Sequence, residues 1–125
     1  MTYKLIIQGR LPCLNDYIKA MNSNRHVGNT LKQDTQNAIG WQINQQLRGV
    51  CITSKVKMHY TWIEPNMKRD LDGITIGKKF IQDSLVNCGV LKNDGWANVG
   101  GFSDSFSVDK NNPRIEVLIL EIEGD

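Results

Sequence analysis

The chain has 125 residues, of which 40% are hydrophobic and 22% are charged, and its formal net charge is +2. This length predicts a single domain over residues 1–125. The three cysteines form no CxxC pair and the two histidines are isolated, which excludes a disulfide framework and a typical zinc site and favours a reduced, cytoplasmic protein. No apolar stretch is long enough to span a bilayer, and the first residues do not resemble a signal peptide, so we expect no membrane partner.

The charge is divided unevenly along the chain. Residues 1–69 carry ten Lys/Arg and three Asp/Glu, or +7, whereas residues 70–125 carry five and ten, or −5. A basic half joined to an acidic half is typical of a protein that holds a polyanion next to a carboxylate site. Chance clustering on a solvated surface produces the same pattern.

The first half of the chain predicts a strand, a loop and a helix. Residues 3–11 alternate like a strand that is stopped by Gly9 and Pro12. Residues 11–30 mix short apolar pieces with Asn, Ser and Gly, which predicts a loop with one helical turn at most. Residues 31–48 are helical in pattern, with a loose apolar stripe formed by Ala38, Trp41, Ile43 and Leu47.

The second half predicts a strand at 55–64, a helix at 74–88 and two closing strands at 98–109 and 114–123. The first of these strands alternates between an apolar face and a basic face, and Gly89 is suited to end the helix. Two helices on a mixed β-sheet, in a two-layer α+β domain, is the simplest packing of these elements.

An acidic stretch lies between the third and fourth predicted elements. Asp70 and Asp72 flank Leu71, which we expect to point into the core, and two lysines follow. The spacing fits neither a calcium loop nor a Walker A loop, so we expect no nucleotide cofactor. The residues alone leave two interpretations: a Mg²⁺ site on Asp70 and Asp72, or a solvated loop whose charge is balanced by lysines.

The string from Lys68 to Trp96 resembles the core of the RusA family of Holliday junction resolvases, which is commonest in phages and prophages. The matching positions are Arg69, Asp70, Asp72, Lys79, Asp83, Gly89 and Asp94. Near the start, Pro12 and Asn15 resemble a Pro-x-x-Asn motif of the family. Gly73 stands where the family often has Asn, and the segment between Asp72 and the lysine is three residues longer than in the best-known members.

This resemblance implies a homodimeric, Mg²⁺-dependent endonuclease of a bacterial cell, encoded by a phage or prophage, that resolves four-way DNA junctions by paired nicks. It implies metal binding by Asp70, Asp72 and Asp94 and a catalytic cation at Lys79, preferred over Lys78, with Asp83 as the partner that orients it. The residues expected to contact DNA are Asn15, Arg25, Lys68, Arg69 and Lys78. The alternatives are a nuclease for flaps or forks and a DNA-binding module that has lost catalysis.

Overall fold

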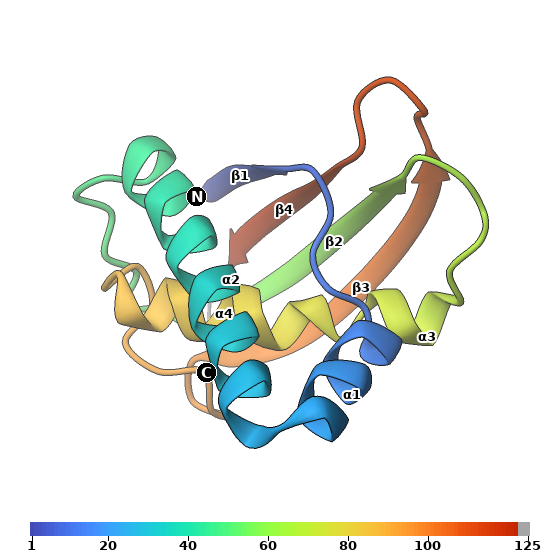
Figure 1. Cartoon of the computed structure of the whole chain (residues 1–125). Coiled ribbons are helices and arrows are strands. Elements are labelled where there is room, and N and C mark those ends of the chain that lie inside the picture. Colours follow the sequence, from blue (N-terminus) through green and yellow to red (C-terminus); the bar gives the residue numbers. More distant parts are fainter. Residues whose placement is uncertain (123–125) are drawn as a thin grey trace.

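A computed structural model describes residues 1–122 of the chain and shows four helical segments and four strands. Figure 1 labels them along the chain. In order they are β1 (Thr2–Gln8), α1 (Leu14–Ser23), α2 (Arg25–Gln46), β2 (Val56–Glu64), α3 (Leu71–Ile74), α4 (Gly77–Asn87), β3 (Val99–Val108) and β4 (Arg114–Glu121).

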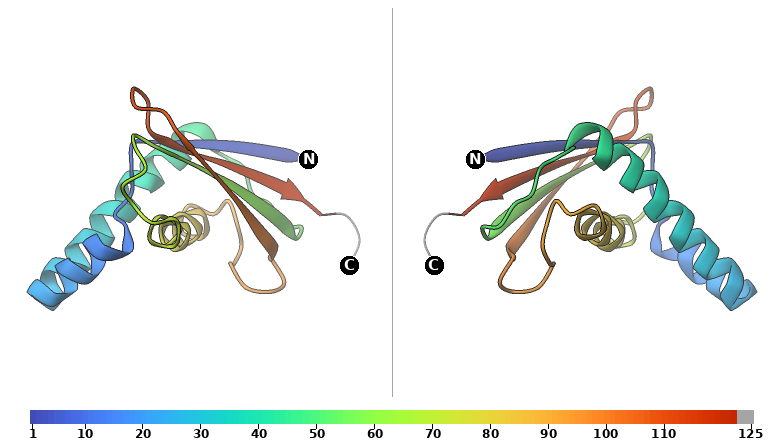
Figure 2. Two further views of the ribbon diagram at one scale, coloured as in Figure 1. Left: turned by 90° about the vertical axis from the view of Figure 1, so that its right-hand side faces the viewer. Right: turned by 90° about the vertical axis from the view of Figure 1, so that its left-hand side faces the viewer.

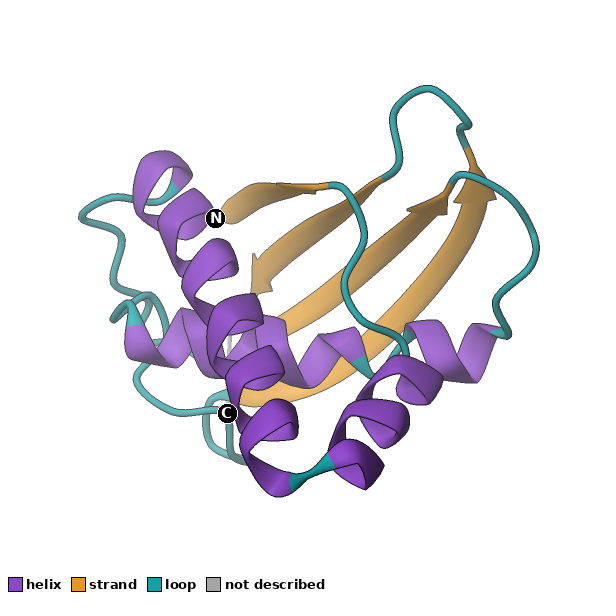
Figure 3. Ribbon diagram, in the orientation of Figure 1, coloured by secondary structure: helices purple, strands orange, loops and turns teal. Residues whose placement is uncertain are grey.

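The four strands form one mixed sheet in the order β1-β4-β2-β3. β4 pairs antiparallel with both β1 and β2, and β2 pairs parallel with β3. The parallel pair is possible because α3 and α4 lie between β2 and β3 in the chain and supply the crossover. The helices cover one face of the sheet (Figure 2), so helices and strands form two layers (Figure 3). The predicted α+β fold with a mixed sheet is confirmed.

A single hydrophobic core lies between the sheet and the two longer helices. The fully buried side chains come from alternate positions of β1, β2 and β4 and from the inward stripes of α2 and α4, as the strand and helix periods require. They include Leu5, Ile7, Ile39, Ile43, Met58, Tyr60, Trp62, Ile81, Leu85, Val117 and Ile119. Removing one of the larger aliphatic side chains to alanine would cost about 2–5 kcal/mol.

The prediction of a loop over residues 11–30 is wrong, because the chain forms α1 and the first turns of α2 there. Two local bonds begin these helices. The carboxylate of Asp16 accepts from the Cys13 backbone N–H at 3.0 Å, and the Asn24 side chain accepts from the Val27 N–H at 2.8 Å. Asn and Ser are frequent in loops because they bond nearby backbone groups, and here Asn24 uses that capacity as a helix cap.

The inward stripe of α2 also differs from the predicted one. Trp41 is 64% exposed, whereas Thr35, Ile39, Ile43 and Leu47 are buried. These four residues repeat every four positions and therefore line one side of the helix, whereas Trp41 lies two positions beyond Ile39 on the opposite side. Trp41 is thus not a core residue.

The edge strand β3 adds no fully buried side chain to the core in the described part of the chain. Phe102 and Phe106 are 49% and 37% exposed, and Val108 is 47% exposed. Among the described residues, no helix is both long and apolar enough to cross a membrane.

Candidate active site

Asp70 and Asp72 lie where the chain leaves the sheet and enters α3. Asp70 is the residue before the helix, with extended backbone angles (φ −72°, ψ 147°), and Asp72 belongs to the first turn. Both residues are exposed, and within residues 1–122 neither carboxylate has a hydrogen-bond or ion-pair partner. Two carboxylates without protein partners are free to bind a cation.

The predicted geometry of this pair is wrong in one respect. We expected an extended segment with Leu71 pointing into the core, but α3 begins at Leu71 and that side chain is 55% exposed. The helical turn rotates successive side chains by about 100° instead of 180°. The buried residue of α3 is Ile74.

Lys79 bridges two of the other predicted acidic residues. Its Nζ lies 3.0 Å from Asp83, one turn further along α4, and 3.2 Å from Asp94 in the turn after that helix. Hydrogen bonds to Asp83 and then Asp94 raise the pKa of Lys79, because they stabilise its protonated form. The side chain is 69% exposed, which keeps this charge accessible from solution.

Lys78 points to a different element although it is the neighbouring residue. Its Nζ lies 2.9 Å from the Asp104 carboxylate on β3 and sits over the rings of Tyr60 and Phe102 at 5.3 and 4.9 Å. Asp104 also accepts a 2.9 Å hydrogen bond from Nε1 of Trp62. The expected contact between Lys78 and DNA would therefore require this ammonium group to leave an ion pair and two aromatic rings.

The carboxylates that the resemblance assigns to a metal do not meet in one cluster. Within the described residues, no group of three or more His, Cys, Asp or Glu side chains is arranged to hold a metal ion. Asp94 is bound to Lys79 instead. A hydrated Mg²⁺ commonly uses one or two carboxylates plus substrate phosphate oxygens, so Asp70 and Asp72 fit such an ion, whereas Asp94 fits it only after releasing Lys79.

Arg69 connects the acidic segment to the first helix. Its guanidinium group donates to the Leu11 carbonyl at 2.8 Å and to the Asp16 carboxylate at 2.9 Å. A hydrogen bond from the Cys13 backbone lowers the pKa of Asp16, and the charges of Arg69 and Arg10 add to this effect. The residue expected to contact DNA thus also holds the segment that carries Asp70 in place.

The other residues expected to contact DNA are exposed. Asn15 lies in the first turn of α1, beside Asp16, which binds Arg69, whereas Arg25 begins α2 at the other end of α1. The hairpin of α1 and α2 extends beyond the sheet (Figure 2). Lys68 lies in the segment before α3, and its backbone N–H donates to the Asn66 side chain at 3.0 Å. These three side chains therefore belong to two separate parts of the surface.

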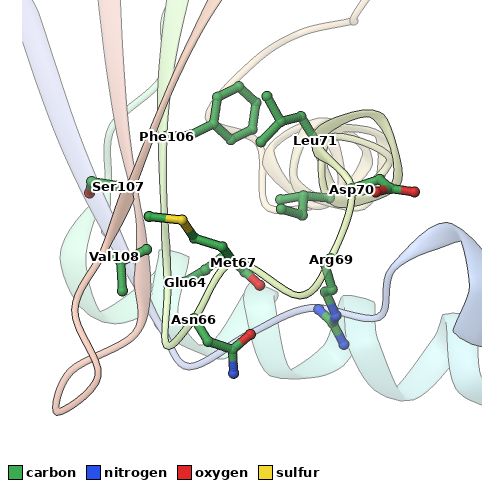
Figure 4. Close-up of a pocket in the computed structure, with 10 residues that line it drawn as sticks. Glu64, Asn66, Met67, Arg69, Asp70, Leu71, Phe106, Ser107 and Val108 are labelled. Atoms are coloured by element: carbon green, nitrogen blue, oxygen red, sulfur yellow. The ribbon is translucent and has the colours of Figure 1, made fainter.

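A cavity of about 430 Å³ lies between this segment and the C-terminal end of β3. It is lined by Glu64, Asn66, Met67, Arg69, Asp70, Leu71, Ile74, Phe106, Ser107 and Val108. Figure 4 shows Leu71 and Phe106 facing each other across it, while the carboxylate of Asp70 points away. The cavity is thus mainly apolar, and sequence patterns could not reveal it because its two walls are about forty residues apart.

Comparisons with known proteins add no assignment. No protein-family model matches the chain, and no curated protein matches it. The features that bear on function are therefore Asp70 and Asp72, which have no partner within residues 1–122, and the ion pairs of Lys79 with Asp83 and Asp94.

Proposed function

We propose that this protein is a Mg²⁺-dependent endonuclease that cuts branched DNA, with four-way junctions as its substrate and a homodimer as its active form. The observation that carries the proposal is the pair of carboxylates Asp70 and Asp72, which have no hydrogen-bond or ion-pair partner within residues 1–122. They precede the exposed ammonium group of Lys79 by nine and seven residues. A solvated loop balanced by lysines would pair these carboxylates with Lys78 and Lys79, but both lysines are bound to other aspartates.

Each of these residues has a defined part in the proposed reaction. Asp70 and Asp72 would hold the ion, and Mg²⁺ bound there would supply an activated water and offset charge on the phosphate. Lys79 would offset the negative charge that develops on the phosphate oxygens. Asp83 and Asp94 hold the Lys79 ammonium group by ion pairs at 3.0 and 3.2 Å.

A synthetic four-way junction tests the proposal directly. Asp72→Asn removes one metal-binding charge with almost no change in shape, so we expect cleavage to fall roughly 100-fold or more while junction binding stays the same or tightens. Asp34→Asn, which alters another exposed carboxylate on α2, is the matched control. Asp72→Asn cleaving at the wild-type rate would disprove the metal-binding assignment.

A specific observation favours one alternative, a DNA-binding module without catalysis. In the described chain Asp94 is engaged by Lys79, and no three-ligand metal group exists. The two functions are separated by incubating the wild-type protein with the junction in Mg²⁺ or Mn²⁺. Tight binding with no product in either metal would establish a DNA-binding module. Faster cutting of forks or flaps than of four-way junctions would make forks or flaps the substrate.

A further inference from the structure

The two edge strands of the sheet, β1 and β3, differ in how many of their outward backbone groups are hydrogen-bonded. Along β1, the side chain of Gln46 accepts from the Ile6 N–H and donates to the Ile6 carbonyl, both at 2.7 Å, and Gln42 accepts from the Gln8 N–H at 2.8 Å. These glutamines of α2 occupy backbone groups that would otherwise be free to pair with another strand. The β1 edge is therefore closed at Ile6 and Gln8, in the second half of the strand.

The β3 edge is open over ten residues. In residues 1–122, no side chain or other strand bonds its outward backbone groups. Natural edge strands are usually protected by Lys, Pro or bulges, yet VGGFSDSFSV contains no lysine and no proline. Its one charged residue, Asp104, is neutralised by Lys78 at 2.9 Å. A second strand can therefore approach without meeting an unpaired charge.

On the face that carries the helices, the exposed side chains of β3 are apolar except for Asp104. Phe102 lies beside Tyr60, with 6.3 Å between the ring centroids, and Asp104 bonds Trp62, so these even-numbered residues face the helices. The opposite face is polar, because Ser103 and Ser105 both bond the ring of His59. Phe106 and Val108 continue the apolar row to the cavity of Figure 4.

We propose that β3 pairs antiparallel with β3 of a second copy of this chain, which joins two four-stranded sheets into one. A strand that pairs with itself about a two-fold axis makes the same contacts in both copies, so each open edge covers the other. This pairing specifies the interface of the homodimer that the proposed function names; it rests on the sheet edge and does not depend on nuclease activity.

The two faces of β3 restrict the register of this pairing. A two-fold axis perpendicular to the sheet keeps each face on its own side, so residues opposite each other must share a face. Centring the axis on Asp104 would place two aspartates directly opposite, which is unfavourable. Centring it on Ser105 places Phe102 opposite Val108 of the second copy. We therefore assign the axis to Ser105.

The size of the surface sets the concentration at which the dimer forms. A ten-residue strand with the adjoining residues Met67 and Leu71 is smaller than the ~20–30 residues per side of a standard interface. We therefore expect a dissociation constant in the micromolar range. Association should be measured at about 10–100 µM protein, without DNA or Mg²⁺.

Sedimentation equilibrium gives the first test. Wild-type protein should be dimeric, and Phe106→Lys should weaken association by about 100-fold or more, because it places a charge on the edge. Val27→Lys is the control, since Val27 is 41% exposed on α2, away from this edge. A wild-type monomer throughout this range, or an unaffected Phe106→Lys dimer, would overturn the proposal.

Engineered disulfides test the register, even if Phe106→Lys folds poorly. In a Cys51→Ser background, Ser105→Cys places two thiols directly opposite, within disulfide reach, whereas Ser103→Cys places them four residues apart, or ~13 Å. Both serines bond His59, so the variants lose equivalent contacts. We expect at least ~5-fold more covalent dimer from Ser105→Cys after mild oxidation. Equal yields, or more dimer from Ser103→Cys, would refute the pairing.

Discussion

Lys78 and Lys79 are neighbours in the chain, yet their ammonium groups bind carboxylates from different elements. Lys79 meets Asp83 and Asp94 near solvent, whereas Lys78, with a side chain only 19% exposed, meets Asp104 above two aromatic rings. Successive residues of a helix point about 100° apart, so adjacent lysines need not share a role. The ammonium group of Lys79 stays accessible from solution, whereas that of Lys78 is held within the fold.

This difference predicts opposite effects for two alanine variants. Lys79→Ala should reduce junction cleavage roughly 100-fold while changing stability by less than ~0.5 kcal/mol, because its ion pairs are solvent-exposed. Lys78→Ala should retain most activity but lose about 1–2 kcal/mol of stability, since Asp104 loses its charged partner. Cleavage assays and urea unfolding measure the two effects. If Lys78→Ala were the less active variant, the assignment of Lys79 as the catalytic cation would be wrong.

Asp16 provides a pH-dependent contribution to stability. The hydrogen bond from the Cys13 backbone, aided by Arg69 and Arg10, lowers its pKa in the folded state. A carboxylate whose pKa is lower in the folded state than in the unfolded state stabilises the fold at any pH above its unfolded-state pKa. This contribution is lost as the pH falls through its folded-state pKa.

We therefore expect the stability difference between wild type and Asp16→Asn to be constant above about pH 5 and to shrink toward zero near pH 2. Urea unfolding at several pH values measures it. Asp34→Asn should show no such trend, because Asp34 has no hydrogen-bond or ion-pair partner in the described chain. A difference that grew at low pH would contradict the assignment.

The helix α2 both packs on the sheet and bonds the backbone of its edge strand β1. Its buried stripe packs on the sheet, while Gln42 and Gln46 bond the backbone of β1 at 2.7–2.8 Å. Glutamine carries both a donor and an acceptor on one amide group, so it can imitate the pairing of a strand. The helix thus replaces a fifth strand at this edge.

Gln46→Ala should destabilise the protein by about 1–2 kcal/mol, because two backbone groups of Ile6 lose their partners together. Gln45→Ala is the control, since Gln45 is exposed on the same helix and has no hydrogen-bond partner among residues 1–122. Amide hydrogen exchange should also accelerate at Ile6 only in the first variant. Equal unfolding midpoints for the two variants would show that the edge bonds contribute nothing.

Considered as a whole, the molecule is a sheet with one helical face and a projecting pair of helices. Figure 2 shows α1 and the first half of α2 extending away from the sheet. The two helices pack closely at Gly28, where an added Cβ would clash with Sδ of Met21. Arg25 is exposed at the tip of this hairpin. The hairpin therefore provides a basic position outside the site that holds Asp70 and Asp72.

If the hairpin contacts the DNA backbone, Arg25→Ala should reduce the slope of log affinity against log salt by about 0.9, the value of one phosphate contact. Junction binding measured by fluorescence anisotropy at several salt concentrations gives this slope. Lys110→Ala, at the exposed turn between β3 and β4, should leave the slope unchanged. An unchanged slope for Arg25→Ala would remove the hairpin from the proposed DNA surface.

Local periodicity in the sequence predicts the strands, the helix that contains α4 and the mixed α+β class. Val56, Met58, Tyr60 and Trp62 are buried as their alternation predicts, and Gly89 adopts the expected positive φ of 79° at the end of α4. The four-residue spacing of Lys79 and Asp83 also survives in the fold, since a helix brings such residues together.

Only the tertiary structure decided the contacts between distant segments. The pairing of Asp94 with Lys79, of Arg69 with Asp16 and of Gln46 with Ile6 joins residues that are 15, 53 and 40 positions apart. No local pattern encodes such pairs, because they depend on the strand order. The same order leaves β3 at an edge, where the side chains of Phe102, Phe106 and Val108 are 37–49% exposed.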